Sequence, residues 1–282
     1  MFKRSLFSFL FLFLITKNLV AIADDADKDS INKIEVDLIS LYNPLGLSFA
    51  AKAYHRKIYH HDDSKLWDGL YYQWAAETNI NPAFIRAGVY FEWMPIAVLQ
   101  VRARYDKLYF SGSNGSLLPF SSKDQRFGDD ELKARIGDEI SGQGDRASLH
   151  VTLRAKFDNL IVRNVSNYSY YQFPGNSPYY LEREHELLMA TNDHVVSNQL
   201  YLLFENNGTN GETSFLGPYH DYAHVRNSGL KSERLGLTWY KEYDKPYAGL
   251  KKPRWYIQSG IYLQEPNRKD EGYLLFGIGG DF

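Results

Sequence analysis

The chain closes on residues 272–282, whose side chains alternate between two unlike rows, and this pattern restricts the fold more than any other feature. Counting back from Phe282 in steps of two gives a glycine and then Ile278, Phe276 and Leu274, an almost wholly apolar row. The row between them is smaller and more polar. Since successive side chains of a strand point to opposite faces, a period of two predicts a β-strand with one apolar and one polar face.

The same alternation recurs along the chain. It is clearest in residues 149–157, where five apolar residues alternate with four polar ones. A strand of a soluble β-sandwich could show this once, but repetition at short intervals indicates an all-β protein with many antiparallel strands. The other segments with two distinct faces are 84–93, 96–105, 234–241 and 255–263.

A two-faced strand that ends on a carboxy-terminal phenylalanine resembles the closing strand of the outer-membrane β-barrels of Gram-negative bacteria. The resemblance implies a barrel in the cell outer membrane, in contact with outer-membrane lipid. It also implies that the barrel-assembly machinery reads the last strand during biogenesis. The resemblance is to the general class and to no particular family within it.

The start of the chain has the pattern of a secretory signal peptide, residues 1–23. Two basic residues precede an apolar run at 6–15, and small residues stand just before Asp24, where cleavage is expected. The run of about 10 residues is shorter than the roughly 20 that a membrane-spanning helix needs. We therefore expect a short periplasmic leader at 24–32 and the barrel at 33–282.

The composition is compatible with a membrane-spanning barrel. The chain has no cysteine, so no disulfide can stabilise it. Aromatic residues make up 16% of the chain, with 22 tyrosines, which would supply the aromatic belts at the two membrane interfaces. A net charge of −2 argues against a nucleic-acid partner. A soluble, aromatic-rich β-sandwich is the alternative that composition leaves open.

The number of strands follows from the segments that alternate or lie between turns. Thirteen can be marked, but a bacterial single-chain barrel has an even number, so one is wrong. The alternation is weakest in 33–42, 179–190 and 213–225, and 179–190 could instead be a helical turn in a loop. We predict an antiparallel transmembrane barrel of about 12 strands, with fourteen as the alternative. The thirteen segments are 33–42, 47–59, 67–77, 83–94, 96–110, 147–157, 160–173, 179–190, 195–206, 213–225, 231–243, 254–264 and 272–282.

The connections between these segments are of two kinds. Met94-Pro95 and Asp158-Asn159 are predicted to be tight periplasmic turns, because proline and Asx residues favour turns. Residues 111–146 are long, polar and rich in glycine, serine and charge, as expected of an extracellular loop.

Histidines and acids stand together at three places. Residues 60–63, His-His-Asp-Asp, have metal-ligand side chains, but adjacent residues rarely converge on one ion, so a solvated turn is the better interpretation. Asp193-His194 and His220-Asp221 could supply the acid–histidine pair of an outer-membrane hydrolase acting on lipid or peptide. A general base needs a cleft and a positioned water, and no sequence feature indicates one. We therefore expect no catalytic residue, metal or cofactor, and keep the hydrolase as the alternative.

The polar rows predict the character of the lumen. If the apolar rows face lipid, basic side chains of three consecutive strands face inward and form a locally basic wall, as in pores that favour anions. Alternatively, acids on other strands pair with these bases and fill a narrow barrel. We predict a porin-like passive channel or a structural surface protein, with unknown oligomeric state. The residues predicted to line the pore are Arg86, Glu92, Arg102, Arg104, Arg154 and Lys156.

Overall fold

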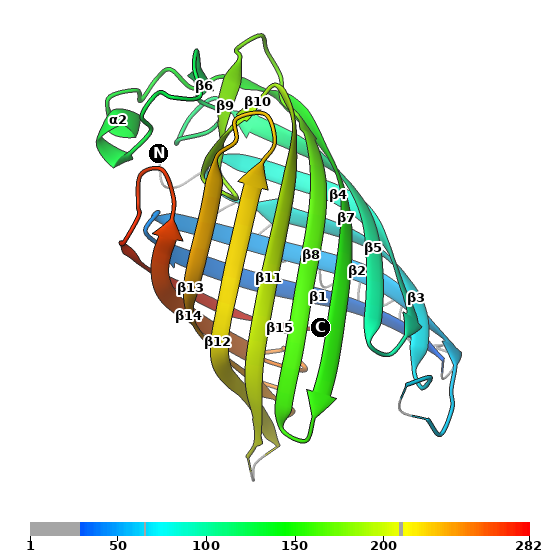
Figure 1. Cartoon of the computed structure of the whole chain (residues 1–282). Helices are drawn as coiled ribbons and strands as arrows, with labels where there is room; N and C mark the ends of the chain where they lie inside the picture. Colours follow the sequence, from blue (N-terminus) through cyan, green and yellow to red (C-terminus); the bar gives the residue numbers. More distant parts are fainter. Residues whose placement is uncertain (1–28, 65, 209–210) are drawn as a thin grey trace.

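The computed structural model describes residues 29–64, 66–208 and 211–282; the predicted signal peptide lies outside them. In the described chain, twelve antiparallel strands form a closed barrel (Figure 1), which confirms the predicted fold class and strand number. In chain order the barrel strands are β1 (Ser30–Tyr42), β2 (Gly46–His60), β3 (Leu70–Ile80), β4 (Phe84–Ile96), β5 (Leu99–Ser111), β7 (Ser141–Phe157), β8 (Leu160–Gln172), β11 (Asn192–Asn207), β12 (Glu212–Val225), β13 (Lys231–Tyr243), β14 (Arg254–Gln264) and β15 (Gly272–Asp281).

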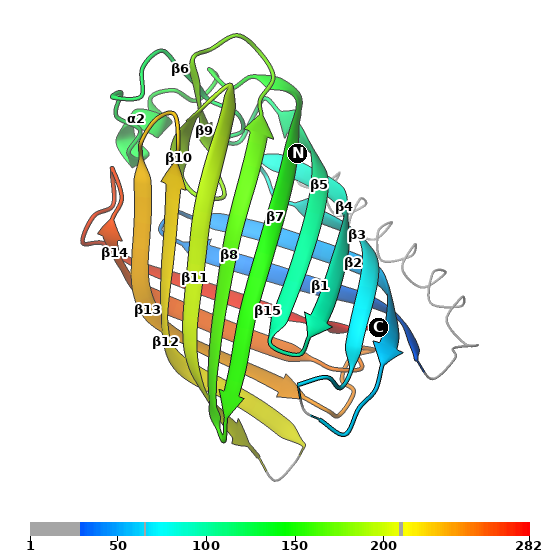
Figure 2. The same cartoon turned by 45° about the vertical axis from the view of Figure 1, so that its right-hand side comes forward.

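Each barrel strand pairs with the next one along the chain, and β15 returns to β1 to close the ring. In that last pairing Glu35 lies opposite Asp281, and Tyr42 lies opposite Leu274. The strands are strongly inclined, so that β1 and β2 cross behind the more upright β8, β11 and β12 (Figures 1 and 2). None of the helices in the described chain is long and apolar enough to cross a membrane.

The two faces of the wall agree with the alternation in the sequence. Large apolar side chains on the outward rows are exposed, as at Val89 (60%) and Leu237 (57%). Their neighbours on the inward rows are buried, as at Tyr90 (3%) and Glu92 (1%). The barrel therefore presents an apolar band outward and encloses a polar, closely packed interior, which is the arrangement that a lipid surround requires.

The two ends of the barrel differ in their connections. One end, here the turn end, carries short links such as 97–98 and 158–159, together with the first residue of β1 and the last of β15. The opposite loop end carries the long connections 112–140 and 173–191, seen at the top of Figure 1 around β6, β9 and β10.

Residues 179–190 are neither a barrel strand nor a helical turn. They form a hairpin of β9 (Tyr179–Glu182) and β10 (Leu187–Ala190), which joins β6 (Pro119–Phe120) in a separate three-stranded sheet. The segment is apolar enough to pair as a strand, but its four-residue turn divides it into two halves that pair with each other. This removes one of the thirteen segments and leaves twelve.

Three boundaries differ from expectation. β1 begins at Ser30 rather than 33, because the polar residues of the expected leader already pair with β2. β7 begins at Ser141 rather than 147, where Gly142 and Gly144 interrupt the alternation without interrupting the ladder to β5. The loop expected at 111–146 is therefore 112–140, and it contains the short helix α2 (Asp129–Lys133) as well as β6.

One of the two predicted turns is correct. Asp158-Asn159 links β7 to β8, with Asp158 in the left-handed region (φ 52°) that Asx residues tolerate. Met94-Pro95 lies inside the end of β4, and the turn is formed by residues 97–98. The ladder is irregular between Trp93 and Ile96, where a proline without an N–H group can be accommodated.

Candidate functional site

The six residues predicted to line the pore all lie on inward rows of the wall. Arg86 and Glu92 project from β4 and Arg102 from β5, all three at least half-buried. They do not converge on one point. The structure divides them into an ion-pair ring near the loop end, a buried pair at mid-height, and bases toward the turn end.

The ring near the loop end begins on the wall itself. Glu77 Oε1 lies 2.8 Å from Arg104 Nη1 and 4.0 Å from Arg86 Nη2. Asp106 Oδ1 lies 2.7 Å from Arg104 Nη2, and its Oδ2 lies 3.9 Å from Arg146 Nε. The wall thus contributes three arginines and two carboxylates, which leaves one positive charge without a counter-charge from the barrel.

The third carboxylate comes from a loop. Glu184, in the turn of the β9–β10 hairpin, places Oε2 2.6 Å from Arg86 Nη1 and 2.6 Å from Arg146 Nη1. Burial alone would raise the pKa of Glu184, but the charges of Arg146 and Arg86 outweigh it and hold that pKa well below 4.5. The ring is therefore electrically balanced only while the hairpin reaches into the barrel.

A second set of polar contacts lies at mid-height. Glu92 accepts a 2.6 Å hydrogen bond from Arg102 Nε and a 2.9 Å hydrogen bond from the Tyr71 hydroxyl. The Arg102 guanidinium also lies over the Tyr90 ring, 4.4 Å from its centroid. Gln73 donates to the Tyr90 hydroxyl at 2.8 Å. The charges of this part of the wall are paired within the wall.

Toward the turn end, the inward bases fall into two groups. In the first, Arg254 lies 2.9 Å from Asp37 and 3.2 Å from Asp281, and Lys33 lies 2.8 Å from Asp281. The second group consists of bases without a carboxylate partner in the described chain.

Arg154 lies directly opposite Arg163 in the β7–β8 register, and both face inward. In the described chain neither they nor Arg56 have a carboxylate within 4.0 Å, whereas Lys156 pairs with Glu205 at 2.6 Å. Arg163 and Arg56 were not among the expected pore residues. The signal for Arg163 was weak because 160–172 carries polar residues on both rows.

The loop end is covered by a cap, which we define as residues 112–140 and 173–191. The cap has an apolar core that packs against inward residues of β5, β8, β11 and β12. A second apolar cluster joins β6 and α2 to the hairpin. The cap residues Leu117, Tyr180, Leu187, Leu188 and Met189 are all fully buried. Both loops are therefore folded, with apolar cores of their own.

Polar contacts join the cap to the other side of the mouth. Arg268, in the link between β14 and β15, lies 2.9 Å from Asp129 Oδ1 and 3.6 Å from Glu186 Oε2. Its Nε donates at 3.0 Å to Asn43, in the link between β1 and β2. Four connections therefore meet at one buried guanidinium.

The two adjacent acid–histidine pairs do not form dyads. Asp193 accepts hydrogen bonds from the backbone N–H groups of Ala190, His194 and Asn227, and so holds the cap in place. The His194 ring points to the opposite face, where its Nδ1 lies 2.7 Å from the Tyr168 hydroxyl.

The second pair is divided in the same way. His220 Nε2 lies 2.8 Å from Glu233 on the outward face, whereas Asp221 pairs with Arg234 on the inward face. Neighbouring residues of a strand point in opposite directions, so sequence adjacency works against the dyad here.

The histidines of residues 60–63 belong to a turn. His61 lies 3.3 Å from both Asp29 and Asp68, and its hydrogen bond lowers the pKa of Asp68. His60 lies 3.6 Å from Asp62. All these side chains are exposed, as expected of a solvated turn.

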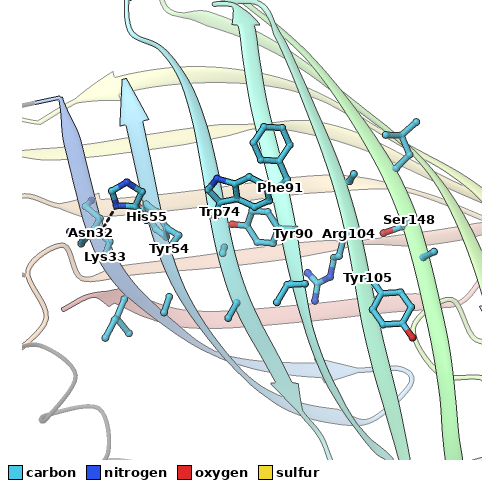
Figure 3. Close-up of a pocket in the computed structure, with 18 of the residues that line it drawn as sticks. Asn32, Lys33, Tyr54, His55, Trp74, Tyr90, Phe91, Arg104, Tyr105 and Ser148 are labelled. Atoms are coloured by element: carbon cyan, nitrogen blue, oxygen red, sulfur yellow. Dashed lines mark hydrogen bonds between the residues drawn. The ribbon is translucent and has the colours of Figure 1, made fainter. Parts of the chain in front are cut away.

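A groove of about 1450 Å³ crosses the outside of the wall over β1–β5, β7 and β8. Its side chains come mostly from outward rows, with Trp74, Phe91 and Tyr105 among those in Figure 3. Trp74 and Phe91 contact each other, with ring centroids 4.5 Å apart. Most of the groove lies on the surface that faces lipid, although the inward residues Tyr90 and Arg104 also contribute to its lining.

The geometry defines the class of protein. A closed antiparallel barrel with an apolar outward band, a polar interior and long loops at one end is an outer-membrane β-barrel. The protein lies in the cell outer membrane.

Comparisons with known proteins give only distant structural matches. No protein-family model matches the chain, and no curated protein matches it. The NanC porin structure has a TM-score of 0.46 at 9% identity and covers 88% of this chain and 98% of its own. The β domain of the Bordetella autotransporter Brka has a TM-score of 0.44 at 8% identity and covers 90% of this chain and 100% of its own. LpxR from Salmonella typhimurium has a TM-score of 0.39 at 9% identity and covers 88% of this chain and 99% of its own. Likeness at this level carries no conclusion about activity.

Proposed function

We propose that the protein is an outer-membrane channel for small anionic solutes, closed at its extracellular mouth by the cap. The observation that carries the proposal is the inward pair Arg154 and Arg163, directly opposite each other and without a carboxylate partner in the described chain. Like charges facing each other across strands are destabilising unless an anion lies between or near them. A wall of unpaired arginines is also how a pore favours anions.

The paired bases contribute less to this preference. Arg86, Arg102 and Arg104 each lie beside carboxylates, so their fields are largely cancelled at a distance. These contacts support an ion-pair network in the loop-end half of the lumen, and the Arg154–Arg163 pair supports a locally basic stretch of wall in the turn-end half. Solute selection is therefore assigned to the turn-end half.

Ion currents through purified full-length protein in planar bilayers test the proposal. Under a salt gradient, the reversal potential should indicate preference for anions, and Arg154→Gln/Arg163→Gln should move it toward zero. Lys123→Gln, which removes a charge from an exposed part of the cap, is the matched control and should leave it unchanged. Absence of current in all of these proteins, and also in a protein whose hairpin residues 177–189 are replaced by a short glycine–serine link, would refute the channel. An unchanged reversal potential in the double variant would refute the role of the two arginines.

A further inference from the structure

Arg86 and Arg146 have the properties of an anion site that is already occupied. Both are at least nine-tenths buried on the inward side of the wall near the loop end. Their shared partner, Glu184, belongs to a hairpin that is not part of the barrel ladder. The site is therefore built by the wall and filled by a loop.

The fit of Glu184 to this site is incomplete. A single oxygen, Oε2, receives both guanidiniums, although a carboxylate can pair with an arginine through both of its oxygens. The Nε atoms of Arg86 and Arg146 are buried without a hydrogen-bond partner. Asp106 lies 3.9 Å from Arg146 Nε, too far for a hydrogen bond. A carboxylate free of the hairpin backbone could turn to use both oxygens and satisfy these donors.

We infer that the Arg86–Arg146 pair is a binding site for the carboxylate group of a passing solute. This inference rests on the channel proposed above. Glu184 acts there as a tethered competitor. When a solute carboxylate takes the site, the hairpin loses its charged anchor and the cap is released. When the solute leaves, Glu184 returns. The tether gives Glu184 a high effective concentration, so millimolar rather than micromolar carboxylate is needed to displace it.

The test uses the full chain with a single reporter. The protein has no native cysteine, so Met189→Cys places one thiol in the buried core of the cap. Its rate of modification by a membrane-impermeant maleimide reports opening of the cap. We expect the rate to rise several-fold in sodium acetate over sodium chloride of equal ionic strength. Equal rates in the two salts would overturn the inference.

Two variants in the reporter background identify the residue responsible. Glu184→Gln should give rapid modification in both salts, because the charged anchor is gone. Glu186→Gln removes the neighbouring acid, which pairs with Arg268 instead, and should keep the difference between acetate and chloride. Loss of the difference in Glu186→Gln, or its persistence in Glu184→Gln, would assign the acetate effect to another site.

Direct binding gives a second readout that does not depend on the cap. In Glu184→Gln the arginine pair is vacant, so acetate should raise the temperature at which the folded band is lost on gels. Addition of Arg146→Gln should abolish that rise. Lack of ion current in every variant would refute the channel and leave these results standing. A conducting protein with no response to acetate would refute this inference alone.

Discussion

The two ends of the lumen differ in whether their inward-facing arginines are neutralised by carboxylates. Near the loop end, Arg86, Arg104 and Arg146 are balanced by three carboxylates, and the apolar core of the cap lies at the same end. Toward the turn end, Arg154 and Arg163 lie opposite each other, and neither has a carboxylate within 4.0 Å in the part of the chain that the structure describes. A loop carboxylate thus completes the neutralisation of the arginines at one end, whereas one stretch of the wall at the other end keeps positive charge without a counter-charge in the described chain.

Removal of the hairpin should have the largest effect on this contrast. Replacing residues 177–189 with a short glycine–serine link takes away Glu184 and the apolar core of the cap. We expect planar-bilayer recordings to change from rare openings to a steady current, with anion preference at least as strong as before. A variant that remains closed would show that the mouth is sealed by something other than the hairpin.

Truncation within the cap should separate its stability from that of the barrel. Leu187→Ala removes a fully buried side chain and should destabilise the closed cap by about 2–5 kcal/mol. Hydrogen exchange of cap amides would then speed up while barrel amides stay protected. Leu203→Ala, at a half-buried inward position toward the other end, is the matched change and should leave the cap unaffected. Equal loss of protection in cap and barrel would mean that the two unfold as one unit.

A charge placed on the lipid-facing side of the wall, which is apolar at both ends of the barrel, should have a smaller effect on stability. Leu153→Arg places a charge on the lipid side of β7 and should cost about 2–4 kcal/mol, measured as reduced assembly and a lower unfolding temperature in detergent. Thr152→Val changes the adjacent inward position and should be milder. The assignment of the two faces would fail if both variants assembled equally poorly.

The pH dependence of the cap should be the smallest effect. Burial lowers the pKa of His185, but its hydrogen bond to Glu182 and the charges of Glu182 and Glu184 outweigh it, so the pKa is raised above 6.5. The protonated ring therefore stabilises the closed cap below pH 6.5, and this contribution is lost as the pH rises through the raised value. Maleimide modification of Met189→Cys should speed up over that range. His185→Gln should remove the dependence; a profile that is flat with the native histidine would contradict it.

Periodicity in the sequence was sufficient for the wall. A period of two identifies which side chains share a face, and the apolar row of 149–157 shares one face of its strand. It failed where glycine or polar residues blur the rows, as at Gly142 and Gly144 in the first part of β7.

Periodicity could not predict the contact between Glu184 and the wall arginines, for a different reason. Glu184 is 98 positions from Arg86 in the chain and lies in a segment that the alternation placed only doubtfully in the wall. Pairing across that distance depends on how a loop folds back into the barrel, and no local pattern encodes it. Arg163 was within reach in principle, because its place opposite Arg154 follows from the tight turn at Asp158.

The position of Glu184 also has an electrical consequence. Its carboxylate sits below the mouth, so release of the hairpin carries a negative charge outward through part of any potential across the membrane. One elementary charge moved through the whole of 100 mV is worth about 2.3 kcal/mol, and a partial path gives a fraction of that. Positive potential on the loop side would favour opening and the reverse polarity would favour closure. We therefore expect opening of the cap to depend weakly on the applied voltage, whatever solute the barrel admits.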